Sequence, residues 1–174
     1  MNVKNDVYKR DLQLLLWCVR SHGYRRFIAF IRIISRSGDG YMQALLPCAI
    51  AIAEPQTGPI FLMITLLAYA IERPLYFVLK RSLKRRRPPD VIPFFSSLVT
   101  PSDQFSFPSG HTMAAFLLAG LCSFYYGSTA YPLYIWACAV GSSRVILGVH
   151  FPTDILAGAC LGTSIAYGVA SLLY

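Results

Sequence analysis

Residues 80–88 read KRSLKRRRP, residues 107–111 read FPSGH and residues 143–154 read SRVILGVHFPTD. Each of these three polar clusters lies beside a long apolar run of the sequence. Charged groups at the edge of a membrane span are costly, so their presence there indicates a function. We therefore interpret the clusters as segments of one candidate site and the apolar runs as candidate membrane helices.

The composition favours a membrane protein. Of the 174 residues, 55% are hydrophobic, and the mean hydropathy of +0.50 is too high for an ordinary soluble domain. In a soluble protein, the formal net charge of +8 would suit a nucleic-acid partner. Because apolar runs of span length accompany that charge, the bilayer is the expected partner and a nucleic acid is not.

The cysteines are expected to be small apolar packing residues. They are scattered, mostly within apolar runs and without a CxxC spacing: Cys18, Cys48, Cys122, Cys138 and Cys160. We expect no disulfide framework, metal site or cofactor from them. No signal peptide is expected either, since the apolar stretch 12–19 is short and lacks a small-residue cleavage site.

Five apolar runs predict an all-α integral membrane bundle. The expected spans are residues 41–53, 60–79, 111–126, 131–149 and 155–173. The first would reach only ~20 Å as a helix, so it spans only with its polar flanks included. Small residues that would allow close helix packing are Gly120, Ala137, Gly141, Gly158, Gly162 and Ala166. We assign residues 38–174 to this domain, with the polar loop 80–111 carrying the site.

Residues 1–37 alternate basic and apolar groups, and we expect them to form amphipathic helices that lie in the membrane surface. One apolar face would hold Leu12, Leu15, Leu16 and Val19, and another Phe27, Phe30, Ile31 and Ile34. Immersing the intervening arginines would cost about 2.5–3.5 kcal/mol each, which excludes a span. His22 is expected at the interface, and Asp39 is expected to cap the next helix.

The distribution of positive charge predicts which way the chain faces. Five spans place the N-terminus and the polar loop on one side, where residues 1–36 hold eight Lys and Arg and residues 80–87 hold six more. The opposite loops, near Pro55 and Gly127, hold none. Because cytoplasmic loops are enriched in these residues, we expect the N-terminus and the site on the cytoplasmic side of the inner or plasma membrane.

Lys80 and Arg87 are candidate phosphate ligands. A phosphate ester needs several donors, and arginine offers a planar fork where lysine offers a compact charge. The alternative is a basic cluster that touches lipid headgroups. To that headgroup cluster we assign Arg81, Lys84, Arg85 and Arg86.

The sequence PSGH at residues 108–111 opens the third apolar run. A helix N-terminus presents free N–H groups and the positive end of the helix dipole, which suits an anion. Gly110 allows close backbone approach, and the Ser109 hydroxyl can donate a hydrogen bond. His111 is suited to protonate a leaving oxygen. The alternative is a helix cap with an interfacial histidine.

His150 and Asp154 flank the connection between the fourth and fifth runs. Their spacing lets the Asp154 carboxylate hold one imidazole nitrogen, which leaves the other as a nucleophilic lone pair. The alternative is a buried histidine that caps a helix. Glu72 lies about two helical turns before Lys80 and is expected to steady Lys80 or Arg144, with a structural ion pair as the alternative.

Together the clusters carry three ordered motifs. These are Lys-x6-Arg-Pro (Lys80, Arg87, Pro88), Pro-Ser-Gly-His (108–111) and Ser-Arg-x5-His-x3-Asp (Ser143, Arg144, His150, Asp154). This signature resembles that of the type 2 phosphatidic acid phosphatase family of membrane lipid phosphatases, and every signature position matches. The resemblance covers residues 80–154, and three motifs in order are far more specific than any one of them.

The resemblance implies a two-step phosphatase that uses neither a metal nor another cofactor. His150 would attack phosphorus to form a phosphohistidine, Asp154 would orient His150, and His111 would protonate the leaving group before water hydrolyses the intermediate. The phosphoryl oxygens would be held by Lys80, Arg87, Ser109, the Gly110 amide and Arg144. Glu72 and Ser143 would support these groups.

The layout departs from that of six-span family members, which have an additional span ahead of the amphipathic region and a site that faces away from the cytoplasm. With five spans in place of six, the site would face the cytoplasm. The arrangement resembles the shorter, arginine-rich members that act on polyisoprenoid diphosphates.

The motifs recognise only phosphate, so several substrates are open: phosphatidic acid, phosphatidylglycerol phosphate, a polyisoprenoid diphosphate or a phosphorylated lipid A. The oligomeric state is open as well. Alternative functions are a lipid-to-lipid phosphotransferase, a non-catalytic membrane scaffold or lipid-binding protein, and a vanadate-using haloperoxidase, whose soluble fold shares the signature. The intact His111, His150 and Asp154 argue against a scaffold, and the spans argue against a haloperoxidase.

Overall fold

The computed structural model describes residues 3–20 and 25–173, which contain helices and no strand. The helices are α1 (Val3–Val19), α2 (Arg25–Ser37), α3 (Tyr41–Ala53), α4 (Gly58–Leu83), α5 (Pro88–Val91), α6 (Gly110–Tyr126), the 3-10 helix η2 (Gly127–Ala130), α7 (Pro132–Ile146) and α8 (Pro152–Leu173). The all-α prediction is therefore confirmed for this part of the chain. His22 lies outside the described residues.

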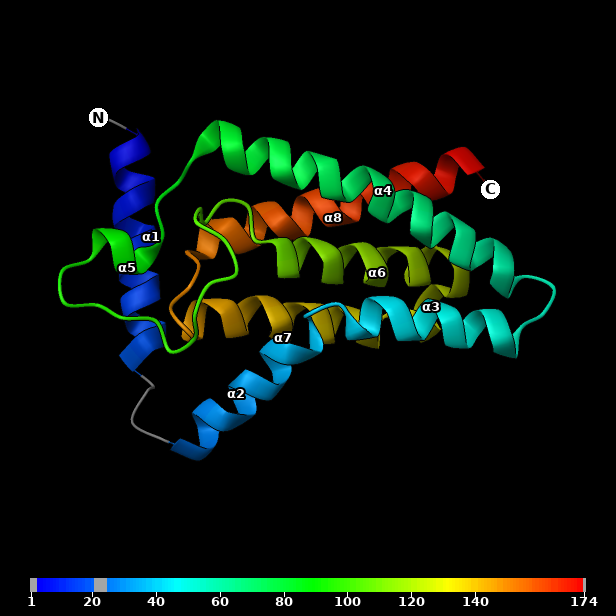
Figure 1. Cartoon of the computed structure of the whole chain (residues 1–174), viewed down its shortest axis with the longest axis horizontal. Coiled ribbons are helices and arrows are strands. Elements are labelled where there is room, and N and C mark those ends of the chain that lie inside the picture. Colours follow the sequence, from blue (N-terminus) through cyan, green and yellow to red (C-terminus); the bar gives the residue numbers. More distant parts are fainter. Residues whose placement is uncertain (1–2, 21–24, 174) are drawn as a thin grey trace.

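The five apolar helices form an elongated bundle. Figure 1 shows α3, α4, α6, α7 and α8 running alongside one another, with α1 and α5 across one end and α2 approaching that end obliquely. The loop between α5 and α6 folds back over the same end. The connections α3–α4 and α6–α7 lie at the opposite end, so the polar segments gather at one end of the bundle.

Helix α6 is the central helix. On one side its Leu117, Leu118 and Leu121 form a buried cluster with side chains of α4 and α8. On another side Ala115 and Ala119 pack against Ala137 and Val140 of α7. Burial of this apolar surface contributes roughly 25 cal/mol per Å² to stability, relative to exposure to water. Packing against α4, α7 and α8 therefore holds α6 in place, and with it the PSGH motif at its N-terminus.

Helix α8 approaches α6 closely because it presents glycines to it. A Cβ atom added at Gly162 would lie 2.2 Å from the Met113 carbonyl oxygen, and one added at Gly158 would lie 2.7 Å from the Ser109 carbonyl oxygen. Such distances leave no space for any side chain. The prediction that these glycines serve close helix packing is confirmed, and Gly158 brings α8 directly against the PSGH motif.

This packing predicts a large effect of one methyl group. Gly162→Ala is expected to lower the melting temperature in detergent by several degrees, because overpacking a tight contact typically costs about 1–3 kcal/mol. Gly168→Ala is the matched control, since it lies on the same helix and a Cβ there meets nothing within 4 Å. Equal melting temperatures for the two variants would contradict the close α6–α8 contact.

The helix bounds follow the expected spans within a few residues. Within residues 3–20 and 25–173, three helices are long and apolar enough to cross a membrane. These candidate spans cover Gly58–Val91, Gly110–Ala130 and Pro152–Leu173. Helices α3 and α7 are shorter, with 13 and 15 residues. Large apolar side chains are exposed on the outer faces of α4 and α8, such as Leu66 at 61% and Leu156 at 65%, as expected of a surface that meets lipid.

Helix α2 packs one side against the bundle and leaves much of its predicted apolar face exposed. Phe27 and Phe30, which were expected to face the membrane surface, are 38% and 59% exposed. The helix buries Ile28, Ile31 and Ser35, and its packing partner is α7. This packing turns Ser35 of α2 toward Arg144, at the end of the bundle that carries the three motifs.

Candidate active site

The bundle brings the three sequence motifs together at one end. Lys80 lies in the last turn of α4, Arg87 precedes α5, and the PSGH residues open α6. Arg144 lies in the last turn of α7, His150 precedes α8, and Asp154 lies in the first turn of α8. Most of these polar side chains are buried, with at most 6% of the residue exposed: Lys80, Arg87, Ser109, Arg144, His150 and Asp154. Buried charge needs partners, and the partners define the site.

His150 and Asp154 adopt the predicted pairing. The Nδ1 atom of His150 lies 3.4 Å from the Asp154 carboxylate, whose same oxygen accepts a hydrogen bond of 2.8 Å from the Phe151 amide. Burial lowers the pKa of His150 to about 4, although the hydrogen bond to Asp154 opposes that shift. The imidazole is therefore neutral near pH 7. Its Nε2 atom lies 3.4 Å from a guanidinium nitrogen of Arg87.

Arg85 is part of this network, which corrects its assignment to lipid headgroups. Its guanidinium lies 2.7 Å from the second oxygen of Asp154 and also pairs with Asp11 of α1. Asp11 in turn accepts a hydrogen bond of 3.0 Å from the Thr153 amide. Both carboxylates are fully buried or nearly so, so they hold Arg85 inward. The first helix is thereby tied to the start of α8.

Lys80 and Arg87 converge on a carboxylate that the motifs do not include. The Asp103 Oδ1 atom lies 2.5 Å from the Lys80 ammonium and 2.7 Å from an Arg87 guanidinium nitrogen, and Tyr76 donates to its Oδ2 atom. Burial alone would raise the pKa of Asp103, but hydrogen bonds from Lys80, Tyr76 and Arg87 lower it to about 2. The two predicted phosphate ligands thus form a cradle that already binds an anion.

His111 pairs with a second carboxylate. Its Nε2 atom lies 2.7 Å from the Oδ1 atom of Asp39 in the connection between α2 and α3. The prediction that Asp39 caps α3 is wrong, because Gly40 takes the cap position with a φ of 109° and no side chain caps that end. Two histidines of the site therefore each have a carboxylate partner.

The start of α6 is closely packed. The Ser109 hydroxyl lies 2.9 Å from the Thr112 hydroxyl, and the Ser109 amide donates to the Asp154 carbonyl oxygen at 3.1 Å. A Cβ atom added at Gly110 would lie 2.7 Å from the Tyr76 ring. Only glycine fits between that ring and the α6 backbone.

Arg144 points toward α2. One of its guanidinium nitrogens donates to the Ser35 hydroxyl at 2.7 Å, while its buried Nε has no hydrogen-bond partner among the described residues. An unpaired buried donor is costly, and an anion would satisfy it. Ser143, which was expected to support these groups, donates its hydroxyl to the Val140 carbonyl of its own helix.

Glu72 contacts neither Lys80 nor Arg144, the two residues that it was expected to steady. It is completely buried and pairs with the adjacent Arg73. Two helical turns separate Glu72 from Lys80 by about 12 Å along the axis, which is too far for a direct bond. Lys80 binds Asp103 and Arg144 binds Ser35. The structural ion pair, named as the alternative, is the arrangement found.

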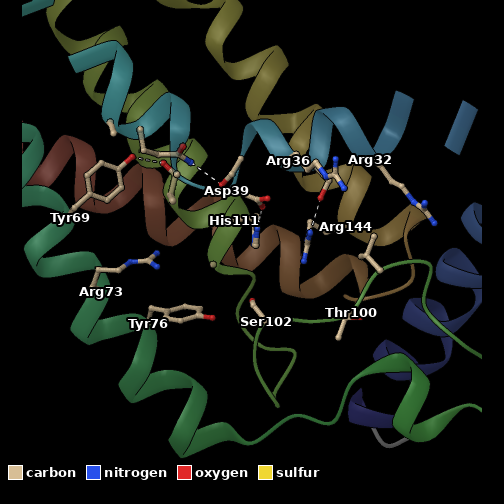
Figure 2. A pocket seen from close by; sticks show the side chains of 18 of the residues that line it. Arg32, Arg36, Asp39, Tyr69, Arg73, Tyr76, Thr100, Ser102, His111 and Arg144 are labelled. Atoms are coloured by element: carbon tan, nitrogen blue, oxygen red, sulfur yellow. Dashed lines mark hydrogen bonds and ion pairs between the residues drawn. The ribbon is translucent and has the colours of Figure 1, made fainter. Parts of the chain in front are cut away.

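A cavity of about 940 Å³ opens beside His111 and Arg144. Its walls come from α2, α3, α4, α6, α7 and the loop at residues 98–102. Figure 2 shows His111 and Asp39 between two walls, with Arg32, Arg36 and Arg144 on one side and Arg73 and Tyr76 on the other. Tyr76 links the cavity to the cradle, since its hydroxyl donates to Asp103. The residues described contain no group of three His, Cys, Asp or Glu side chains that could hold a metal ion.

Comparisons with known proteins find relatives that match more than half of this chain. Phosphatidylglycerophosphatase B of Bacillus subtilis is 37% identical over 111 residues, which cover 58% of this chain and 52% of the relative. Decaprenylphosphoryl-5-phosphoribose phosphatase of Mycobacterium tuberculosis is 38% identical over 99 residues, which cover 55% of this chain and 52% of the relative. The matches thus span about half the length of these curated relatives.

A solved structure extends the likeness over nearly the whole chain. The crystal structure of a transmembrane PAP2-type phosphatidylglycerolphosphate phosphatase from Bacillus subtilis superposes with a TM-score of 0.80 and 26% identity, covering 97% of this chain and 86% of that one. Together with the three helices of spanning length, this likeness identifies an integral membrane protein. The model of the PAP2 superfamily matches residues 60–174, which hold all three motifs. The chain belongs to the PAP2 superfamily.

Proposed function

We propose that this protein is a membrane phosphatase that removes a phosphoryl group from a lipid through a phosphohistidine. The observation that carries the proposal is the neutral, buried His150, whose Nε2 atom lies 3.4 Å from an arginine of an anion-binding cradle. A nucleophile needs a free lone pair and a phosphorus atom held in line with it. The cradle of Lys80 and Arg87 already holds the carboxylate of Asp103.

The reaction proceeds in two balanced steps. His150 Nε2 attacks phosphorus as the bond from phosphorus to the leaving oxygen breaks, and His111 supplies the proton that this oxygen takes up. Water then attacks the phosphohistidine and gives a proton to His111 as the nitrogen–phosphorus bond breaks. Orthophosphate leaves, and both histidines return to their starting protonation states. Asp154 balances the charge that forms on His150. The groups that hold the phosphoryl oxygens are Lys80, Arg87, Ser109, the Gly110 amide and Arg144.

The names of the relatives support a lipid substrate. Two curated relatives are phosphatases of phosphatidylglycerophosphate and of decaprenylphosphoryl-5-phosphoribose, so family members act on both glycerolipid and polyprenyl phosphates. The site lies at the end of a membrane bundle, where a headgroup can reach it while the tail stays in the bilayer. We therefore assign the substrate to lipid phosphomonoesters or diphosphates.

A panel of lipid phosphates tests the proposal. Purified protein in detergent is expected to release orthophosphate from at least one member of the panel, and to keep that activity in excess EDTA. Persistence in EDTA is expected because protein cations and amides supply the charge stabilisation that a metal supplies elsewhere. Free phosphate measured against phospholipid product separates hydrolysis from transfer to another lipid. Release from no lipid phosphate would overturn the proposal, and loss in EDTA would overturn its metal-free mechanism.

Asp103 must leave the cradle before a phosphate can occupy it. Asp103→Asn is expected to strengthen competitive inhibition by orthophosphate roughly tenfold, because a neutral amide competes less well for Lys80 and Arg87. Asp90→Asn is the matched control, since the Asp90 carboxylate accepts a hydrogen bond from the backbone amide of Arg87 and not from its guanidinium. Equal inhibition constants in the wild type and in Asp103→Asn would show that substrate and carboxylate do not share the cradle.

We propose further that the site end of the bundle faces the cytoplasm and that α1 and α2 lie in the membrane surface. Exposed apolar side chains on these helices, among them Trp17 at 71% and Ile33 at 65%, support the surface position. The basic residues of α1, α2 and the loop after α4 support the cytoplasmic side. A cysteine placed at Ser102 should resist a membrane-impermeant thiol reagent in intact cells and react after lysis. Labelling in intact cells would show that the site faces away from the cytoplasm and would contradict this orientation.

A further inference from the structure

Asp39 lies in the connection between α2 and α3, outside the three motifs. Its carboxylate is 2.7 Å from the Nε2 atom of His111, the proton donor of the proposed mechanism. Figure 2 shows the two side chains next to each other at the cavity. Asp39 was expected to cap α3, yet no side chain caps that helix. The carboxylate therefore serves the histidine and not the end of the helix.

The glycines on either side of Asp39 fix the turn in which it lies. A Cβ atom added at Gly38 would lie 2.7 Å from the Val140 side chain, so the backbone packs directly on α7. Gly40 has a φ of 109°, a conformation that residues with a side chain rarely adopt. The Gln43 amide donates to the Gly38 carbonyl at 3.3 Å. This turn brings Asp39 to the start of α6.

The end of α2 is anchored to α7 just before the turn. Ser35 accepts a hydrogen bond of 2.7 Å from Arg144. The Trp136 indole donates to the Ser37 hydroxyl at 2.9 Å. Contacts to a packed helix hold the Asp39 carboxylate in one place, as the orientation of a proton donor requires.

The charges that surround His111 explain why it needs a carboxylate. Arg32, Arg36 and Arg144 line the same cavity, and neighbouring cations disfavour a protonated imidazole. Among the described residues, Asp39 is the only carboxylate within ion-pair distance of His111. Asp39 therefore supplies the negative charge that a protonated His111 requires.

The contact gives the two nitrogens of His111 different tasks. Nε2 carries a proton and donates it to the Asp39 carboxylate. A hydrogen bond at one ring nitrogen determines the state of the other. Nδ1 is thus the nitrogen that can exchange a proton with a reacting oxygen.

We propose that Asp39 is the positioning residue for His111 in both steps of the reaction, with Nδ1 as the atom that moves the proton. This inference rests on the proposed phosphatase function. In the first step, protonated His111 gives its Nδ1 proton to the leaving oxygen as the phosphorus–oxygen bond breaks. Its remaining proton stays on Nε2 beside Asp39. In the second step, Nδ1 takes a proton from the water that attacks the phosphohistidine, which restores the protonated ring.

Substrates with different leaving groups test this role. Asp39→Asn is expected to lower kcat/KM for a lipid phosphate roughly 10–100-fold, because its alkoxide leaving group needs a proton. The variant is expected to keep kcat/KM for p-nitrophenyl phosphate within about threefold of the wild type, since p-nitrophenolate leaves without one. The ratio kcat/KM reports only the steps up to loss of the leaving group. Equal losses on both substrates would indicate a structural role and overturn the inference.

A double-mutant cycle tests whether Asp39 acts through His111. His111→Ala is expected to lower kcat/KM for the lipid phosphate about 10²-fold or more. Adding Asp39→Asn to His111→Ala is expected to lower it less than about twofold further, because the two residues act as one unit. Fully additive losses would show that Asp39 acts independently of His111, which would overturn the inference.

Two further variants separate the carboxylate from other effects of the substitution. Asp39→Glu keeps the carboxylate, and the Asp39 side chain is 42% exposed, which leaves space for the longer chain. It is expected to recover most of the kcat/KM that Asp39→Asn loses. Asp6→Asn is the matched control, since it removes the same charge at an exposed position of α1, and it is expected to keep wild-type kinetics. Failure of Asp39→Glu to exceed Asp39→Asn would count against a role for the carboxylate.

The competing interpretation is that Asp39 only occupies the place of a substrate anion, as Asp103 does in the cradle. In that case Asp39→Asn would lower both KM and the inhibition constant of orthophosphate, and kcat would not fall. That result would overturn the inference.

Failure of the inference can be told apart from failure of the proposed function. Release of orthophosphate from no lipid phosphate by the wild type would overturn the phosphatase function itself. An active wild type together with a fully active Asp39→Asn variant would overturn only the role of Asp39.

Discussion

Replacing His150 with alanine is expected to lower phosphate release on the order of 10³-fold or more, because the variant has no atom to form the covalent intermediate. The expectation follows from the position of Nε2, which lies beside the cationic cradle while Nδ1 faces Asp154. Direct attack by water would have to replace the lost nucleophile. The rate is measured as orthophosphate released per purified protein in detergent.

A matching binding measurement guards against a trivial loss of folding. Lys80, Arg87 and Arg144 are unchanged in His150→Ala, so we expect orthophosphate to raise the melting temperatures of this variant and of the wild type alike. Full phosphate release by a well-folded variant would remove His150 from the mechanism. It would also revive the non-catalytic scaffold as the function of the chain.

Asp154→Asn is expected to lower turnover by roughly 10²–10⁴-fold, the range seen when a carboxylate that orients a histidine becomes an amide. One Asp154 oxygen serves His150 and the Phe151 amide, and the other serves Arg85. An amide cannot accept at both positions, so its NH₂ group must face either His150 or Arg85. If the NH₂ group faces His150, the imidazole loses its fixed tautomer. If it faces Arg85, the amide repels the guanidinium and the ion pair is lost.

Asp11→Asn provides the control for that variant. Asp11 also binds Arg85, yet it does not contact His150. We expect Asp11→Asn to lower the melting temperature while reducing turnover far less than Asp154→Asn does. Near-normal turnover in Asp154→Asn, or equal losses in the two variants, would assign Asp154 a structural role in the Arg85 network and none in orienting the nucleophile.

The sequence predicted the helices because their apolar runs are long and sharply bounded. The run 41–53 corresponds to α3, and the run 111–126 differs from α6 by one residue at its start. The PSGH glycine and the polar residues around it mark that start. Periodicity could not tell which face of α2 would be buried, since Ile28 and Ile31 are buried through packing against another helix.

The partners of the site residues could not be predicted in the same way. Asp39 lies 72 positions from His111, and Ser35 lies 109 positions from Arg144. Such contacts depend on how separate helices pack, and no local spacing encodes them. Asp103 was missed because it lies in an irregular loop outside the motifs. Its only sequence signal is that it is the sole acidic residue between Val91 and Pro108.

The most direct test of the account is to trap the covalent intermediate. A lipid phosphate labelled with ³²P in the terminal phosphate is mixed with excess enzyme and quenched in alkali, in which phosphohistidine is stable. We predict transient label on the wild-type protein, located to the peptide that contains His150 and absent from His150→Ala. Label on another residue, or turnover without any labelled protein, would contradict catalysis through His150.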